Sequence, residues 1–285
     1  MIQRITDRVF STLFIVLMSS MSLVYGSSSY SIPFENINGL MLIEGDFDGQ
    51  KGRFIFDTGA DEILLHSDRV QSDQSVFQTV GDNLLAEKGE INYLTLGNYR
   101  EEDVTVYKTD LQSLQDYTST PVAGIVGLSM FDVEVLHIDN VNNTIQLYTL
   151  DQINMVSDRK FVRNRMSTYD GLPILNVTIG NTDYNFAMDS GATTSFVCET
   201  VMMSQVKEFD RLDSSFRVST AAGETDSHYY SCDAITLGKL KIKDLRFGTS
   251  DLTQVEGISG ILSLDSLPSE EIIFDFVTGH IYMSI

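Results

Sequence analysis

The sequence contains no tryptophan, only two cysteines, four prolines and four histidines among its 285 residues, and it is poor in positive charge. Its 19 lysines and arginines stand against 40 aspartates and glutamates, which gives a net charge of −21. A nucleic acid or an anionic membrane would repel such a chain, so neither is an expected partner. The acidic surplus either serves solubility, the simpler interpretation, or reflects a preference for cationic substrates. The histidines are dispersed without metal-ligand spacing, so we expect neither a metal site nor a cofactor.

Long apolar runs are also absent, except at the start of the chain. Met1–Gly26 carries Arg4 and Arg8 near its beginning and an apolar run at Val9–Val24. This pattern is typical of a secretory signal peptide. Serines dilute the run, which makes an uncleaved membrane anchor the weaker alternative. We therefore expect an exported protein, periplasmic or secreted, that has no membrane contact in its mature form.

Two short stretches of the chain resemble each other closely. They are FIFDTGA at Phe54–Ala60 and FAMDSGA at Phe186–Ala192, and each predicts a strand that ends in an aspartate on a glycine turn. Around them, Asn38–Ala60 aligns without gaps on Asp170–Ala192. Three further pairs of blocks follow in the same order: Leu94–Leu111 with Ile235–Leu252, Ala123–Phe131 with Ser259–Leu267, and Leu136–Tyr148 with Ile272–Ser284. This order indicates an internal duplication.

The duplication divides the chain into two lobes. We expect a signal peptide at 1–26, a lead-in at 27–36, an N-terminal lobe at 37–150, a linker at 151–168 and a C-terminal lobe at 169–285. A hydrophobic content of 42% is enough for one large core or two modest ones. The 20 glycines, four prolines and few helix-periodic stretches favour sheet over helix. The sequence therefore predicts two β-rich lobes that are copies of one another.

Local signals place turns and helices within the lobes. Asp48-Gly49 and Gly180-Asn181 predict matching hairpin turns. An amphipathic helix is expected at Glu199–Leu212, and a short helix or turn at Leu65–Gln74.

A second pair of hairpins lies within Phe77–Glu90 and Phe216–Ser227, whose glycine-bearing tips include Gly81 and Gly223. They are either flaps over a cleft, where the two glycines would contact a substrate, or ordinary surface hairpins.

Two-fold pseudo-symmetry would bring Asp57 and Asp189 together. Adjacent carboxyl groups do not both ionise easily, so one keeps a proton while the other is charged. The pair then offers a general acid and a general base at once. A water between the two can be deprotonated and directed at a carbonyl carbon, without a metal, a serine nucleophile or a cysteine nucleophile.

Taken as an ordered set, these motifs resemble those of the aspartic protease clan. The resemblance is carried by D-T-G-A at Asp57–Ala60, D-S-G-A at Asp189–Ala192 and the apolar-apolar-glycine motif Ile125-Val126-Gly127. The chain is similar to a retropepsin-like (retroviral-type) domain duplicated in one chain, in a pepsin-like bilobed arrangement. The resemblance implies an all-β fold of two pseudo-symmetric β-barrel lobes with a few short helices. It also implies an endopeptidase that binds a peptide or protein between the lobes and works as a monomer.

The resemblance also implies roles for the residues around the catalytic pair. Six residues would support the two loops: Thr58, Gly59, Ala60, Ser190, Gly191 and Ala192. The two hydroxyls would bond across the lobe interface, and the glycine amides would face the carboxylates. Asp61 matches an acidic residue that binds substrate backbone.

Two departures from the family pattern distinguish the lobes. Thr193 stands where a second equivalent of Asp61 would be, and Ser263 replaces the motif glycine that Gly127 supplies in the first lobe. The alternative function is accordingly a non-catalytic peptide-binding protein that retains the fold. The intact Asp57 and Asp189 favour the enzyme, because a binder needs no paired carboxylates.

The two cysteines, Cys198 and Cys232, fall in the same lobe. In an exported chain we expect them to form a disulfide, with two buried free thiols as the alternative.

Overall fold

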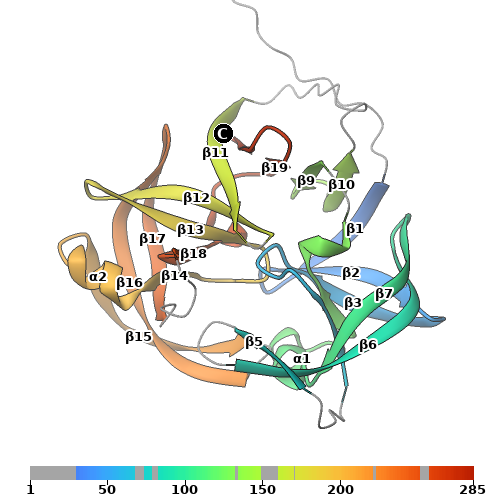
Figure 1. Ribbon diagram of the computed structural model, residues 1–285. Coiled ribbons are helices and arrows are strands. Elements are labelled where there is room, and N and C mark those ends of the chain that lie inside the picture. The colour runs from blue at the N-terminus through green and yellow to red at the C-terminus, as the bar shows by residue number, and fades with distance from the viewer. Residues whose placement is uncertain are drawn as a thin grey trace, which may run out of the picture.

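The protein is built mainly of β-strands, several of which are buried along their whole length. The computed structural model describes residues 30–67, 74–78, 83–131, 134–148, 160–169, 171–220, 223–250 and 257–285. Within these ranges the chain forms twenty strands and two short α-helices (Figure 1). The all-β prediction is confirmed. The predicted signal peptide lies outside the described residues.

The N-terminal lobe is a strongly bent sheet of seven strands. These are β2 (Leu40–Phe47), β3 (Gln50–Phe56), β4 (Ile63–His66), β5 (Gln74–Gln78), β6 (Asn83–Leu96), β7 (Tyr99–Thr109) and β8 (Gly124–Val126). Between β2 and β3, Asp48 and Gly49 have φ angles of 49° and 82°, which suit the predicted tight turn. Strand β6 pairs antiparallel with β2, β5 and β7. Strand β4 runs parallel to β7 and antiparallel to β8, and β8 runs parallel to β3.

The C-terminal lobe repeats this topology strand for strand. Its strands are β12 (Leu172–Ile179), β13 (Thr182–Asp189), β14 (Ser195–Cys198), β15 (Phe209–Thr220), β16 (Gly223–Leu237), β17 (Leu240–Ser250) and β18 (Gly260–Ser263). Strand β16 pairs with β12, β15 and β17, as β6 does with β2, β5 and β7. Strand β18 runs parallel to β13 and antiparallel to β14, as β8 does with β3 and β4. The predicted duplication is therefore confirmed.

A third sheet joins the two lobes. We call it the interlobe sheet, and its order is β1 (Tyr30–Ile37), β10 (Thr144–Tyr148), β9 (Val135–Asp139), β19 (Glu271–Asp275), β20 (His280–Ser284) and β11 (Phe161–Tyr169). Strands β1 and β11 run on from this sheet into the lobes, where they pair with β2 and β12. Segments that we expected to be lead-in and linker thus contribute strands that tie the lobes together.

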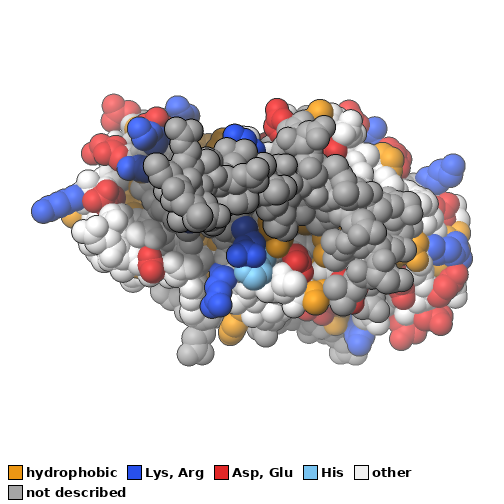
Figure 2. Space-filling view, turned by 90° about the horizontal axis from the view of Figure 1, so that it is seen from above, with side chains coloured by type: hydrophobic (Ala, Val, Ile, Leu, Met, Phe, Trp, Pro, Cys, Tyr) orange, Lys and Arg blue, Asp and Glu red, His pale blue; other side chains and the backbone are white. Residues whose placement is uncertain are grey.

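Charged side chains are unevenly placed on the face of the molecule nearest the interlobe sheet. Acidic and basic side chains are interspersed over the two lobes, and further basic side chains lie beside a histidine between them (Figure 2). The strand register places Arg165 of β11 opposite His280 of β20.

The helices are short and lie on the outside of the strands. Helix α1 spans Gln112–Thr118 and α2 spans Glu199–Ser204. The helix that we predicted over Glu199–Leu212 is wrong beyond Ser204, because Phe209 begins β15 and is buried opposite Cys232. The predicted helix or turn at Leu65–Gln74 falls mostly outside the described residues. No helix in the described part of the chain is both long and apolar enough to span a bilayer.

The predicted disulfide is wrong. Both cysteines are buried and form no disulfide, and each thiol donates to a carbonyl oxygen, Cys198 to Ile258 and Cys232 to Ala234. Cys198 on β14 lies opposite Ser250 on β17, whereas Cys232 on β16 lies opposite Leu245 of that same strand. Five residues along a strand span roughly 16 Å, and β17 itself separates the two cysteines, so a bond of Cα separation below about 7 Å cannot form.

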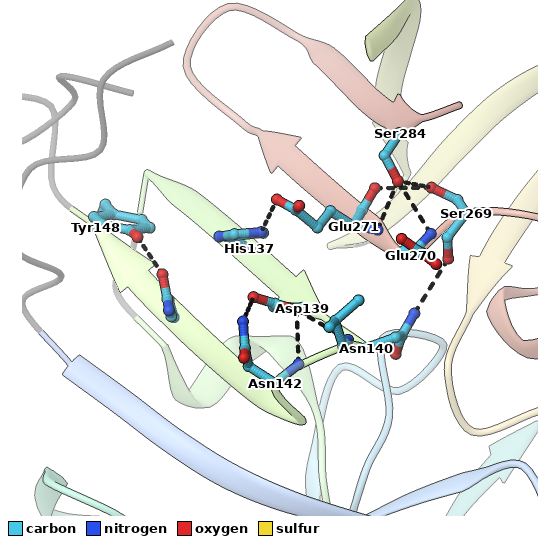
Figure 3. Close-up of polar contacts among 11 residues, drawn as sticks. His137, Asp139, Asn140, Asn142, Tyr148, Ser269, Glu270, Glu271 and Ser284 are labelled. Atoms are coloured by element: carbon cyan, nitrogen blue, oxygen red, sulfur yellow. Dashed lines mark hydrogen bonds and ion pairs between the residues drawn. The ribbon is translucent and has the colours of Figure 1, made fainter. Parts of the chain in front are cut away.

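Titratable side chains are buried on one face of the interlobe sheet (Figure 3). His137 is 3% exposed, and its Nε2 lies 3.2 Å from Oε2 of Glu271. Asp139 is opposite Glu271 in the register and accepts hydrogen bonds from the backbone amides of Val141 and Asn142. Burial lowers the pKa of His137, and the two carboxylates oppose this change only in part. The folded state therefore favours the neutral imidazole.

We predict that this histidine makes the protein less stable in mild acid. Its folded pKa lies below the unfolded value of about 6.5, so the unfolded chain takes up the proton more readily as the pH falls through that range. Relative to the wild type, a His137→Gln variant should lose less unfolding free energy between neutral pH and mild acid. Urea denaturation across this range measures the difference. The control is His280→Gln in β20, and equal pH dependence for His137→Gln and the wild type would contradict the prediction.

Candidate active site

Asp57 and Asp189 sit at the ends of equivalent strands. Phe54 and Phe56 of β3 are buried in the core, so the strand is held firmly up to the residue before Asp57. The Asp57 amide then donates to the Val126 carbonyl of β8 at 3.0 Å. Asp189 ends β13 and lies opposite Ser263 of β18. Each aspartate is therefore fixed where a lobe's parallel strand pair ends.

The two aspartate loops meet face to face across the lobe interface. A side-chain carbon on Gly59 would lie 2.5 Å from Cγ of Asp189, and one on Gly191 would overlap Cγ of Asp57. Such contacts leave room only for glycine at both positions. Each carboxyl group thus lies against the loop that carries the other, close enough for the two charges to interact.

Backbone amides hold the orientation of each carboxyl group. The Gly59 amide donates to Asp57 Oδ1 at 2.8 Å. Oδ1 of Asp189 accepts two amides, from Gly191 at 2.7 Å and from Ala192 at 3.0 Å. The two carboxyl groups are thus held in similar ways, but Asp189 accepts one more of these amide hydrogen bonds from its own loop than Asp57 does.

Burial raises the pKa of both carboxyl groups. For Asp189, the negative charge of Asp57 adds to burial, and the pKa lies well above its usual range. For Asp57, the hydrogen bond from Asp189 and the amides of Gly59 and Gly191 offset part of the rise. When the pair holds a single proton, one carboxyl group is protonated and the other is ionised.

Thr58 and Ser190 lock the two loops together beneath the carboxyl groups. The Thr58 amide donates to Oγ of Ser190 at 2.9 Å, and the Ser190 amide donates to Oγ1 of Thr58 at 3.0 Å. Each hydroxyl then donates into the other lobe, Thr58 to the Met188 carbonyl and Ser190 to the Phe56 carbonyl. Both residues are almost fully buried, so water does not compete with these four bonds.

Comparison with known proteins agrees with this geometry. Residues 43–130 and 175–265 each match the family model for aspartyl proteases. The chain belongs to the aspartyl protease family. An aspartic proteinase from Irpex lacteus aligns over 90% of this chain and 96% of its own, with a TM-score of 0.55 and 11% identity. At that identity the likeness shows the fold. None of the curated proteins matches the chain.

The remaining predicted residues of this aspartyl protease lie around the pair. Ala60 and Ala192 are half-buried beside their aspartates. Asp61 is exposed, and a side-chain carbon on Gly171 would lie 2.6 Å from its Oδ1, so Asp61 abuts the turn before β12 of the other lobe. Its contact with substrate backbone stays a prediction.

The flap hairpins are described only in part. Gly81 lies outside the described residues, whereas Gly223 begins β16 opposite Thr220. The hydroxyl of Ser113 on α1 donates to the Thr220 carbonyl at 2.6 Å, so the C-terminal hairpin contacts the N-terminal lobe. Substrate contact by either glycine stays a prediction.

Sequence reasoning missed the contacts that α1 makes with the other lobe. Besides Ser113, the Tyr117 hydroxyl lies 3.3 Å from Oγ1 of Thr193 in the other lobe, and it donates to the carbonyl of Asn38 in its own lobe at 3.0 Å. Nothing in the local sequence around α1 signals these contacts, because they depend on how the lobes meet. Among the described residues, no three His, Cys, Asp or Glu side chains form a group that could hold a metal ion.

We predict that the four-bond lock stabilises the fold strongly. Thr58→Val keeps the shape but leaves the Ser190 amide and the Met188 carbonyl buried without these partners. The expected loss is about 2–4 kcal/mol of unfolding free energy. Urea denaturation of the variant measures it. Thr168→Val, at an exposed threonine of β11, is the control and should stay within about 0.5 kcal/mol of the wild type. A Thr58→Val protein as stable as this control would contradict the prediction.

Proposed function

We propose that the protein is an exported, monomeric aspartic endopeptidase that hydrolyses peptide bonds with Asp57 and Asp189. The observation that carries the proposal is the mutual approach of these two buried carboxyl groups, each of which lies against the loop that carries the other. A pure binding protein would have to bear the repulsion of this buried pair without using it.

The geometry supports hydrolysis by an activated water. Ionised Asp57 takes a proton from the water, whose oxygen bonds to the carbonyl carbon of the substrate. Protonated Asp189 at the same time gives its proton to the carbonyl oxygen. When the tetrahedral intermediate collapses, the C–N bond breaks and the proton on Asp57 passes to the leaving amine. The pair is restored when the new acid's hydroxyl proton returns to Asp189.

The monomeric state and the export of the protein are inferred from the sequence. A monomer suffices because one chain supplies both aspartates. Export is inferred from the basic start and apolar run of Met1–Gly26. The substrate would be a peptide or protein, and the mechanism needs no cofactor.

We predict that Asp57→Asn and Asp189→Asn each lower turnover by about a thousandfold or more, because the carboxyl groups act as one unit. A peptide library assayed between pH 3 and pH 8 measures cleavage. Asp183→Asn, at an exposed position of β13, is the control and should cleave as the wild type does. Normal turnover in either dyad variant would refute the mechanism, and peptide binding without cleavage by the wild type would favour a non-catalytic binder.

The same dyad variants should be more stable than the wild type at neutral pH. Both carboxyl pKa values are raised in the folded state, so wild-type stability rises as the pH falls toward the usual carboxyl range of about 4. An amide removes this dependence, so Asp189→Asn should melt at a higher temperature at pH 7, and the gap should close near pH 4. A melting temperature of Asp189→Asn below that of the wild type at pH 7 would contradict this prediction.

We predict a weakly acidic optimum, about pH 4–6, because alanine follows the glycine in both loops. A hydroxyl at these positions could donate to the outer carboxylate oxygen and so lower the pKa. Ala60→Ser and Ala192→Thr should therefore move both limbs of the pH–rate profile to lower pH. Ala123→Ser, before β8, is the control. An upward shift in the two loop variants would contradict the prediction.

A further inference from the structure

The loop behind each aspartate is braced by the strand that ends beside it. In the N-terminal lobe this brace is entirely backbone. The Leu128 amide donates to the Ala60 carbonyl at 3.0 Å, and the Gly127 amide donates to the Glu62 carbonyl at 3.2 Å. A side-chain carbon on Gly127 would lie 2.5 Å from the Ala60 oxygen and 2.7 Å from the Glu62 oxygen. Glycine is required here because the two backbones touch.

In the C-terminal lobe, three serine side chains brace the loop that follows Asp189. Oγ of Ser263 donates to the Ala192 carbonyl at 2.5 Å. The Ser263 amide donates to Oγ of Ser195 at 3.1 Å, where its counterpart in the other lobe reaches a carbonyl. Oγ of Ser266 donates to the Ser263 carbonyl at 2.7 Å and lies 2.9 Å from Oγ of Ser195. Ser263 and Ser195 are fully buried.

The direction of every bond in this serine network follows from counting protons. Each hydroxyl has one proton to donate. Ser263 uses its proton on Ala192, and Ser266 uses its proton on the Ser263 carbonyl. Ser195 must therefore donate to Ser266, while its own oxygen accepts the Ser263 amide. The network is satisfied throughout and ends on the carbonyl of Ala192.

Ala192 is the residue through which this network reaches the catalytic pair. Its carbonyl is held by Ser263, and its amide donates to Asp189 Oδ1 at 3.0 Å as the second donor on that oxygen. Fixing the carbonyl end of one residue restricts the direction in which its amide points. We propose that Ser263, supported by Ser195 and Ser266, is a positioning residue that holds the Ala192 amide on the carboxylate of Asp189.

The proposal rests on the proposed endopeptidase function, and it changes the meaning of Ser263. In the sequence this serine is a departure from the glycine motif and favours a non-catalytic binder. In the structure its hydroxyl replaces a backbone bond and keeps the loop of Asp189 in place. The substitution is therefore compatible with a working pair.

The test compares Ser263→Ala with Ser269→Ala. Ser269 is a buried serine of the same lobe whose hydroxyl donates to the Glu271 carbonyl and lies 3.3 Å from Oγ of Ser284, with no hydrogen bond to either aspartate loop. Both variants lose a buried hydroxyl, but only Ser263→Ala frees the Ala192 carbonyl. We expect kcat of Ser263→Ala to fall about tenfold with KM unchanged. Its pH–rate profile should move to higher pH, because a weakened amide bond no longer favours the ionised carboxylate. Ser269→Ala should leave kcat and the profile as in the wild type, and Ser263→Thr, which keeps the hydroxyl, should restore both.

A second readout separates this proposal from the proposed function. The carboxyl groups of the pair can be titrated by carbon NMR with labelled aspartate, whether or not the protein cleaves peptides. Ser263→Ala should shift this titration to higher pH, and Ser269→Ala should not. If Ser263→Ala does not fold, Ser266→Ala should shift the titration in the same direction by a smaller amount. A wild type that cleaves no peptide refutes the proposed function alone. An unchanged titration and pH profile in the folded Ser263 or Ser266 variant, or an equal change in Ser269→Ala, overturns the positioning role.

Discussion

Two carboxyl groups buried against each other set the main constraint on this structure. Burial and the charge of its partner both oppose the ionisation of Asp189, so the pair costs free energy at neutral pH. The two aspartate loops can stay together only if other interactions between them offset this free-energy cost. Thr58 and Ser190 supply these interactions through four hydrogen bonds in a region that water does not reach. The glycines that follow then allow each loop to approach the opposite carboxylate.

The interlobe sheet keeps the two halves in the relation that the pair requires. Strands β1 and β11 belong half to this sheet and half to a lobe, so each lobe is hydrogen-bonded directly into the shared sheet. The sheet also buries His137 beside the carboxylates of Glu271 and Asp139, which lie opposite each other in the register. We therefore expect the stability of the lobe arrangement to depend on pH at a place away from the aspartate pair.

Equivalent positions of the two lobes make their contacts through different chemical groups. Gly127 leaves a backbone-to-backbone contact, whereas Ser263 fills the equivalent place with a hydroxyl bond. Asp61 abuts a turn of the C-terminal lobe, whereas its counterpart Thr193 receives the hydroxyl of Tyr117. Duplication thus preserved the strand pairings while side-chain contacts at the interface diverged. A change that looks like a loss in one motif can be compensated by residues distant in sequence.

The sequence alone determined the features that repeat or depend on neighbouring residues. Its duplicated blocks predicted two β lobes of one topology, and its two glycine turns predicted which aspartates would meet. The sequence also predicted the turn at Asp48-Gly49, because the positive φ angles of a tight hairpin turn are favoured by the turn residues themselves. The prediction from local periodicity was wrong where long-range burial decided the structure. The periodicity of Glu199–Leu212 predicted a longer helix, but α2 ends at Ser204 and Phe209 is buried in β15.

The tertiary structure alone decided the contacts between segments with no pattern in common. The separation of Cys198 from Cys232 depends on which strands flank β17, and so the number of cysteines could not reveal it. The bridge from α1 to the other lobe and the serine network behind Asp189 likewise depend on the register of strands distant in sequence. Such contacts carry no periodic signal, because each satisfies a buried polar group that exists only after the lobes have closed.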